Sequence, residues 1–190
     1  EHLFAMLGAV GLQLSLLADG PVRVGAARPV RCPLDGRSWV DVAPGWLLGA
    51  DDLYHRFCTA LRWEHRSRMM FGALVAEPRL TAVLRVGTPG APEPLGAIVD
   101  ALRSEYGEAL PHLWANWYRS GQDAVAWHAD RVGRSGRHPL VAIVTLGGPR
   151  TFAVRRRGGG LARRWRLCSG DLLVMGGACQ HEWEHTVPRE

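Results

Sequence analysis

The second half of the chain is a succession of short apolar runs separated by turn sequences. The runs cover residues 113–118, 124–128, 140–146, 151–155, 164–168, 171–175 and 183–187. Glycine-containing segments lie between them, among them Ser120-Gly121, Gly147-Gly148-Pro149 and Gly176-Gly177. Several short strands at close spacing are typical of a double-sheet β fold, either a jelly roll or a barrel.

The first half contains two helical patterns. Asp51 and Asp52 are suited to cap a helix that runs to about Trp63, and Pro94 suits the first turn of a helix that runs to about Leu110. The apolar stripes of these helices are Leu53, Phe57 and Leu61 in the first and Leu95, Ile98, Val99, Leu102 and Tyr106 in the second. We therefore predict an α+β fold, in which two N-terminal helices support a double-stranded β-helix, or jelly-roll, sandwich.

The chain has the length of one compact domain. We expect residues 1–37 to form a partly irregular N-terminal arm and residues 38–190 to form the domain. Between the two helices, residues 69–84 have strand-like stretches that we expect to be broken at Gly72 and Pro78. The apolar run over residues 3–17 is too short to span a bilayer and lacks a basic leader, so we expect no membrane segment and no signal peptide.

Composition narrows the possible chemistry. All 23 basic residues are Arg, which excludes catalysis by a lysine Schiff base or a P-loop lysine. The net charge of +5 favours an anionic partner, because guanidinium groups pair with phosphate in a bidentate way. The four cysteines have no metal-site or disulfide-framework spacing, so we expect reduced thiols in a cytoplasmic protein.

A metal site is predicted from His128 and Asp130. Positions i and i+2 of a strand point to the same side, so this imidazole and this carboxylate can bind one cation. His181 and His185 are both candidates for a third ligand, on one face of a later strand together with Trp183. Two histidines and one carboxylate form the facial triad of non-haem Fe(II) oxygenases.

Two alternative interpretations apply to these histidines and their neighbours. In the first, His128 and Asp130 cap a loop and the third residue is an ordinary surface histidine. In the second, Cys179, His181 and His185 bind zinc, although three near-sequential ligands do not match a closed site of four.

The surrounding motifs resemble the AlkB family of Fe(II)/2-oxoglutarate-dependent dioxygenases, which act in bacterial nucleic-acid alkylation repair. Six motifs follow one another in the family's order, and the segment at residues 77–82 resembles the family's substrate lid. The six motifs lie at residues 116–119, 125–130, 139–147, 149–152, 170–175 and 183–188. The resemblance covers roughly residues 38–190, which we therefore expect to be an AlkB-like dioxygenase domain.

The resemblance implies catalytic metal ligands and co-substrate contacts. His128, Asp130 and His185 match the iron ligands, and His185 is favoured over His181 because the family's distal histidine directly precedes a small residue and Val-Pro. Asn116 and Tyr118 match the pair that contacts 2-oxoglutarate. The implied reaction is oxidative dealkylation of N-alkylated bases with Fe(II), 2-oxoglutarate and O2, releasing formaldehyde, succinate and CO2.

One family feature is not found. In the family, a strand after the distal histidine carries an Arg-x-Asn/Ser-x-x-x-Arg motif, whose first arginine binds the distal carboxylate of 2-oxoglutarate. The sequence has five residues after His185, so we expect this C-terminal strand to be missing from it.

Basic and aromatic residues predict a nucleic-acid surface. Arginines bracket Gly158-Gly159-Gly160, among them Arg156 and Arg157. A second basic loop beside the proposed metal contains Arg131 and Arg134. We expect these four arginines to bind phosphates with salt-dependent affinity. The alternative for the glycine-centred segment is a solvated basic hairpin.

Four further residues are expected on the substrate side. Met70 and Phe71 can form an apolar tip that wedges into a base stack, or they can be core strand residues. Arg79 belongs to the lid segment, and Trp127 is a candidate stacking surface.

The expected partner is alkylated DNA, single- or double-stranded, with RNA as an option, and the expected state is a monomer without membrane contact. The competing interpretations are a non-catalytic nucleic-acid-binding module of the same fold and a dioxygenase that acts on RNA, protein or lipid.

Overall fold

A computed structural model describes residues 2–8, 20–70, 72–87, 93–107, 110, 112–130 and 139–190. For residues 3, 68–70 and 73–75 it describes the backbone only.

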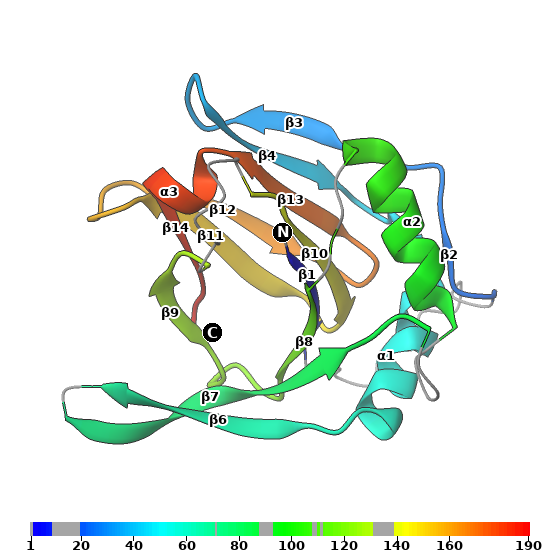
Figure 1. The fold of residues 1–190 in the computed structure, drawn as a ribbon, viewed down its shortest axis with the longest axis horizontal. Helices are drawn as coiled ribbons and strands as arrows, with labels where there is room; N and C mark the ends of the chain where they lie inside the picture. The colour runs from blue at the N-terminus through cyan, green and yellow to red at the C-terminus, as the bar shows by residue number, and fades with distance from the viewer. Residues whose placement is uncertain are drawn as a thin grey trace.

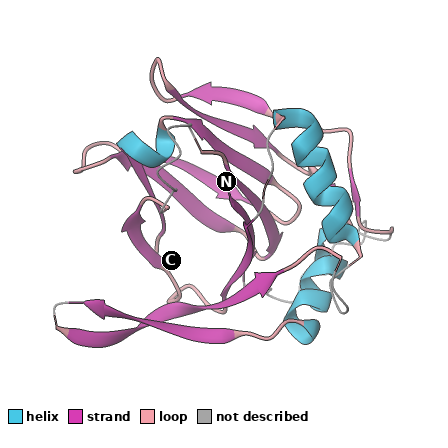
Figure 2. Cartoon of the chain, viewed as in Figure 1, coloured by secondary structure: helices cyan, strands magenta, loops and turns pink. Residues whose placement is uncertain are grey.

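Two sheets face each other and form the body of the fold (Figures 1 and 2). The larger sheet has the order β3-β4-β13-β10-β1-β8-β7-β6 and the smaller sheet the order β12-β11-β14-β9. The strands of the larger sheet are β1 (His2–Gly8), β3 (Val30–Pro33), β4 (Ser38–Ala43), β6 (Glu64–Met70), β7 (Ala73–Leu84), β8 (His112–Tyr118), β10 (Val141–Gly147) and β13 (Leu172–Gly177). Those of the smaller sheet are β9 (Val125–His128), β11 (Arg150–Arg156), β12 (Arg163–Leu167) and β14 (Trp183–Val187), while β2 (Arg23–Val24) pairs with β5 (Leu47–Leu48). The predicted jelly-roll α+β class is confirmed.

The larger sheet buries both of its faces. Alternate residues of β10 and β13 point to opposite sides, so one set meets the smaller sheet and the other set meets the helices. Toward the smaller sheet lie Val141, Ile143, Leu173 and Met175, packed with Phe152, Val154 and Leu167. Toward the helices lie Ala142, Val144, Leu146, Leu172 and Val174. Burial on both sides explains why these strands are apolar at nearly every position.

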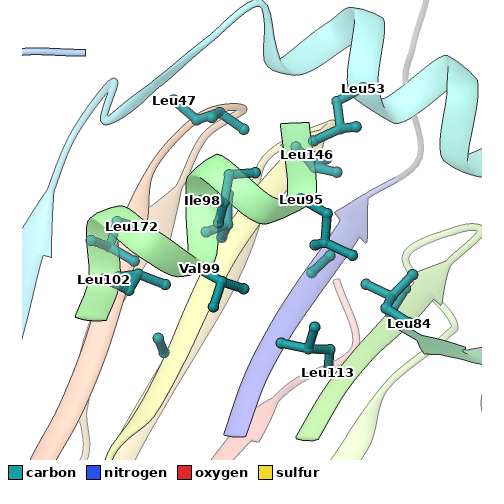
Figure 3. Packing of buried hydrophobic residues seen from close by; sticks show 14 of the residues in the cluster. Leu47, Leu53, Leu84, Leu95, Ile98, Val99, Leu102, Leu113, Leu146 and Leu172 are labelled. Carbon is teal, nitrogen blue, oxygen red and sulfur yellow. The ribbon is translucent and has the colours of Figure 1, made fainter. Parts of the chain in front are cut away.

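Two helices cover the outer face of the larger sheet, α1 (Ala50–Ala60) and α2 (Pro94–Tyr106) (Figure 3). The stripe predicted for α2 is confirmed, because Leu95, Ile98, Val99 and Leu102 are all buried. The predicted end near Leu110 is wrong. The helix ends at Tyr106 because Gly107 adopts a left-handed conformation, with φ of 68°, which closes the last turn.

The predicted cap and end of α1 are wrong. The residue before α1 is Gly49, with φ of 68°, and no side chain caps the helix. Asp51 instead accepts a hydrogen bond from Ser169 Oγ at 2.6 Å, which ties the helix to the turn before β13. The helix ends at Ala60, before Leu61 and Trp63, because Leu61 takes an extended conformation.

The predicted arm over residues 1–37 contains strands β1, β2 and β3. Strand β1 lies at the centre of the larger sheet and runs parallel to both of its neighbours, β8 and β10. Ala5, Met6 and Leu7 are buried, as expected for a central strand with both faces covered.

The strand over residues 69–84 is broken at Gly72, as predicted, but not at Pro78. Strand β7 continues through Pro78 because the pairing of β6 and β7 shifts register between His65 and Ser67, so no ladder donor is needed there. The carbonyl of Pro78 accepts a hydrogen bond from the Ala124 amide at 2.9 Å, which joins β7 to the segment before β9.

Within the described residues, no helix is long and apolar enough to cross a membrane.

Candidate metal centre

Three predicted ligands meet between the two sheets. His128 ends β9 and lies opposite His185 of β14 in the antiparallel pairing of these strands. Asp130 follows two residues after His128. Its carboxylate oxygens lie 3.8 Å from His128 Nε2 and 3.6 Å from His185 Nε2. One ligand atom from each of the three residues lies within 4.8 Å of the other two, so the residues are placed to hold one metal ion.

Neighbouring groups hold each ligand in orientation. His128 Nδ1 donates to the carbonyl of Ala126 at 2.8 Å, which leaves Nε2 facing the Asp130 carboxylate. The amide of Asp130 donates to Oε1 of the buried Gln180 at 2.9 Å. The ring of Phe152 stacks on His185 with centroids 5.5 Å apart.

The electrostatics of the three residues suit a cation. Burial lowers the pKa of His185 well below its ordinary value, and positive charge on His128 and Arg79 lowers it further, so His185 is a neutral ligand. Burial raises the pKa of Asp130, although positive charge, first that of His128, opposes the rise. Asp130 Oδ2 is buried and has no hydrogen-bond partner. A divalent cation would satisfy this oxygen, so the donor set fits an iron ion.

The three ligands line a cavity shared with the predicted co-substrate pair. Its other lining residues are Phe4, Met6, Arg79, Asn116, Tyr118, Val125, Ile143, Phe152 and Val187. Asn116 and Tyr118 lie two residues apart on one face of β8, as predicted, while Phe4 and Met6 come from β1.

Comparison with known proteins agrees with this geometry. A family model described as the 2OG-Fe(II) oxygenase superfamily matches residues 58–190. The chain belongs to this superfamily. The resemblance to AlkB proteins is also confirmed, because the chain is similar to "Alpha-ketoglutarate-dependent dioxygenase alkB homolog 3" of several mammals.

The relatives differ in how much of their length is matched. Identity to the alkB homolog 3 proteins is 29% over 177 residues in Homo sapiens and 31% over 178 residues in Mus musculus, with 82% of this chain and 62% of each relative covered. The "DNA oxidative demethylase ALKBH2" of Arabidopsis thaliana is 31% identical over 120 residues, which cover 50% of this chain and 38% of the relative. The chain thus spans about three fifths of the length of its mammalian relatives.

Arg79 lies inside the oxygenase cavity and not on its surface. Its side chain is mostly buried, and Nη2 lies 3.3 Å from Glu77 Oε2. Burial raises the pKa of the Tyr118 hydroxyl, and the nearby Arg79 guanidinium acts against this rise. The residue predicted for the substrate lid is therefore a neighbour of the co-substrate pair.

Sequence reasoning assigned no role to Arg150 or Gln180. Arg150 is buried at the start of β11, where its terminal nitrogens donate to the carbonyls of Ser120, Asp123 and Pro188 at 2.7–2.9 Å. It thereby ties the loop before β9 to the end of β14. Strands β9 and β14 are those that carry His128 and His185. The sequence feature that could have indicated a buried role for Arg150 is its position as a charged residue next to apolar strand residues. Nothing in the sequence indicated a role for Gln180.

Four predicted substrate residues fall where little can be described. Phe71, Arg131 and Arg134 lie outside the described residues, and of Met70 only the backbone in β6 is described.

The other predicted substrate residues lie outside the cavity. Arg156 pairs with Asp35 at 2.7 Å and with Glu182 at 2.9 Å. Arg157 donates to the carbonyl of Gln180 at 3.3 Å. Trp127 is not part of the cavity lining, and its ring lies against the guanidinium of Arg155 at 4.1 Å.

The arrangement predicted for His181 is wrong. His181 lies in the short helix α3 (Cys179–Glu182) that precedes β14, so it does not share a strand face with His185. Cys179 of the alternative zinc site is buried, and its Sγ donates to the carbonyl of Trp39 at 3.3 Å. Within the part of the chain that the structure describes, the group of three possible ligands is the His128, Asp130 and His185 set.

Proposed function

We propose that this protein is an Fe(II)- and 2-oxoglutarate-dependent dioxygenase that removes alkyl groups from nucleic-acid bases. The observation that carries the proposal is the His128, Asp130 and His185 set in one cavity with Asn116 and Tyr118. The printed names of the relatives, a dioxygenase dependent on alpha-ketoglutarate and a DNA oxidative demethylase, support the same reaction class.

The ligand set leaves room for the reactants. Nε2 of each histidine and the Asp130 carboxylate would hold the iron, and the bound ion would still have coordination positions for a 2-oxo acid and O2. The bound iron, with 2-oxoglutarate and O2, supplies the oxidation of an N-alkyl group, and the products are succinate, CO2, formaldehyde and the repaired base.

The chain's own residues position these groups. The side-chain amide of Asn116 and the hydroxyl of Tyr118 provide hydrogen bonds for the co-substrate from one face of β8. Ile143, Phe152 and Val187 form an apolar wall of the same cavity and exclude water from the reacting groups.

A nucleic-acid substrate is supported by an aromatic residue on the face of β8 that carries Asn116 and by a basic residue of β6 beside it. Trp114 lies two residues before Asn116, and the guanidinium of Arg66 lies 4.3 Å from its ring centroid. A base that has left its stack can pack on an aromatic ring while a guanidinium pairs with its phosphate. Strand β12 adds the exposed Arg163, Arg164 and Arg166.

The test is mass spectrometry of methylated DNA and RNA oligonucleotides after incubation with the protein, Fe(II), ascorbate and 2-oxoglutarate. We expect loss of the methyl group together with release of formaldehyde and succinate, and no turnover by His128→Ala. Succinate release without demethylation would favour a protein, lipid or small-molecule substrate. Oligonucleotide binding without succinate release would favour a non-catalytic module. Either result would overturn the proposal.

We also propose that the protein acts as a monomer in the cytoplasm. All four cysteines are unpaired thiols, which is in keeping with a reducing compartment.

A further inference from the structure

The turn between β3 and β4, residues 34–37, lies against α3, the short helix that precedes β14 (Figure 1). The carbonyl of Arg37 accepts a hydrogen bond from the Ala178 amide at 2.9 Å, and the Arg37 side chain forms an ion pair with Glu182 at the end of α3. Since α3 leads directly into the strand that carries His185, contacts made by this turn can act on the metal centre.

Asp35 makes the central contacts of the turn. Its Oδ1 accepts hydrogen bonds from the amides of Arg37 at 2.8 Å and Ser38 at 2.7 Å. Its Oδ2 accepts a hydrogen bond from Trp183 Nε1 at 3.2 Å and pairs with Arg156 Nη2 at 2.7 Å. The hydrogen bond from the Arg37 amide lowers the pKa of Asp35, although burial opposes this effect, so the carboxylate is charged at neutral pH. One carboxylate thus joins the turn to β11 and β14.

Arg156 extends these contacts to α3. Its Nη1 donates to Glu182 Oε2 at 2.9 Å, while Nη2 pairs with Asp35. Arg156 lies opposite Trp183 in the pairing of β11 with β14, and its guanidinium is 4.9 Å from the centroid of the Trp183 ring. The carboxylate, the guanidinium and the indole together hold the start of β14 against the turn.

Two of the three proposed metal ligands are directly connected to this contact set. Trp183 lies two residues before His185 on β14, so the two buried side chains point to the same side of the strand. Helix α3 carries Gln180, whose Oε1 accepts the hydrogen bond from the Asp130 amide at 2.9 Å. A shift of α3 or of the start of β14 would therefore move ligand atoms relative to one another.

The local backbone does not fix this region alone. Helix α3 has four residues, and no side chain caps its first turn. The pairing of β14 with β9 shifts register between His185 and Val187, and such an irregularity interrupts the ladder. Side-chain contacts at the start of β14 therefore contribute to the placement of His185.

We propose that Asp35 is a positioning residue of the metal centre. By accepting the hydrogen bond from Trp183 and pairing with Arg156, it holds the start of β14 so that His185 lies where it can share one ion with the other two ligands. Outer contacts of this kind orient metal ligands and tune the affinity for the ion. The inference rests on the metal site of the proposed function and deepens it.

The test replaces Asp35 by asparagine, which has nearly the same shape. An asparagine Oδ1 can still accept from the Arg37 and Ser38 amides, so the turn should keep its conformation. The new amide nitrogen then faces two donors, Trp183 Nε1 and Arg156, and both contacts are lost. We expect Asp35→Asn to bind Mn(II) about tenfold or more weakly in calorimetry and to alter the electron paramagnetic resonance spectrum of the bound ion.

The matched control is Asp41→Asn, on β4 of the same hairpin. Asp41 is also a carboxylate held by an arginine and an aromatic side chain, Arg31 and Tyr106, but it contacts α2 and not α3. This variant should lose stability toward urea and keep the Mn(II) affinity and spectrum of wild type. The inference is overturned if Asp35→Asn binds Mn(II) as wild type does. It is also overturned if Asp41→Asn weakens binding by the same factor, since the loss would then follow from lower stability.

A second variant removes the same hydrogen bond from its donor side, and it covers the case in which Asp35→Asn does not fold. Trp183→Phe keeps an aromatic ring in the core but lacks the Nε1 donor. We expect Mn(II) affinity to fall about threefold or more, and we expect the fall in the double variant to be smaller than the product of the two single falls. Wild-type affinity in Trp183→Phe, or independent effects in the double variant, would contradict the inference.

These experiments use Mn(II) alone, without nucleic acid, and so separate the inference from the proposed function. If Asp35→Asn and Trp183→Phe weaken Mn(II) binding while wild type turns over no methylated oligonucleotide, the proposed function fails and the role of Asp35 stands. If wild type does not bind Mn(II), both fail.

Discussion

The rings of His128 and His185 lie opposite each other in the pairing of β9 with β14, with centroids 4.3 Å apart and planes inclined by 54°. Strand register therefore sets the distance between two proposed metal ligands that are far apart in the sequence. A slip by one residue would turn one imidazole to the outer face of the smaller sheet.

Replacing either histidine should remove the metal and leave the fold. We expect His128→Ala and His185→Ala to abolish demethylation and to lose Mn(II) binding in calorimetry, because two remaining ligands hold the ion poorly. The far-ultraviolet circular dichroism should stay near that of wild type. His55→Ala, at an exposed position on α1, is the control. Substantial turnover by either ligand variant would refute the assignment.

Gln180 should position Asp130 rather than bind the metal itself. Gln180→Leu keeps a similar volume but removes the acceptor for the Asp130 amide, and we expect Mn(II) affinity to fall roughly 10- to 100-fold, as for other outer-shell changes. Gln122→Leu, at an exposed position, should have no effect. Unchanged Mn(II) affinity in Gln180→Leu would show that the backbone alone orients the carboxylate.

Arg150 should contribute to stability through its three carbonyl contacts. Arg150→Met leaves those carbonyls without their donor, and we expect a loss of about 2–4 kcal/mol in the free energy of unfolding. Urea denaturation measures this change, and the exposed Arg164→Met serves as the control. A loss as small as that of the control would mean that the two loops are held by other contacts.

A polar cluster should anchor α2 to the outer face of the larger sheet. Asp41 is buried and accepts hydrogen bonds from Arg31 Nε at 2.8 Å, Arg31 Nη2 at 2.9 Å and the Tyr106 hydroxyl at 3.3 Å. Since Arg31 is half exposed, we expect Asp41→Ala to cost about 1–3 kcal/mol. A double-mutant cycle with Tyr106→Phe should show coupling, while Mn(II) affinity stays constant. Additive effects in the cycle would argue against a shared cluster.

Trp114 should contribute to nucleic-acid binding and not to metal binding. We expect Trp114→Ala to weaken binding of a single-stranded oligonucleotide by about 1–3 kcal/mol through loss of base stacking. Fluorescence anisotropy measures the binding, and calorimetry with Mn(II) and 2-oxoglutarate should show no change. Trp127→Ala, on β9 with its ring against the Arg155 guanidinium, is the matched control. Equal losses in both variants would remove the reason to place the base at Trp114.

The parts of the site that could be predicted are those set by local alternation. His128 and Asp130, like Asn116 and Tyr118, are spaced by two residues, and a strand places such pairs on one side whatever lies beyond it. The family motifs then predicted His185 as the third ligand. The stripe of α2 was predictable for a similar reason, because apolar residues spaced at the helical period lie on one face of the helix.

The parts that could not be predicted depend on contacts distant in the sequence. An acidic residue at the start of a helix often caps it. At α1, however, Gly49 precedes the helix, and Asp51 accepts a hydrogen bond from Ser169 instead. Arg79 belongs to a segment whose pattern is that of a surface lid, and only the pairing of β7 with β8 places it in the cavity. The apolar run that contains β1 indicated burial but not its partners.

The central position of β1 has a consequence for how the chain folds. Residues 2–8 join β8 at residues 112–118 to β10 at residues 141–147, so the two halves of the larger sheet are connected through the strand at the start of the sequence. Contacts across such long separations close large loops and slow the folding reaction. Until β1 docks, two strand edges stay unpaired, and the chain is exposed to aggregation for that interval.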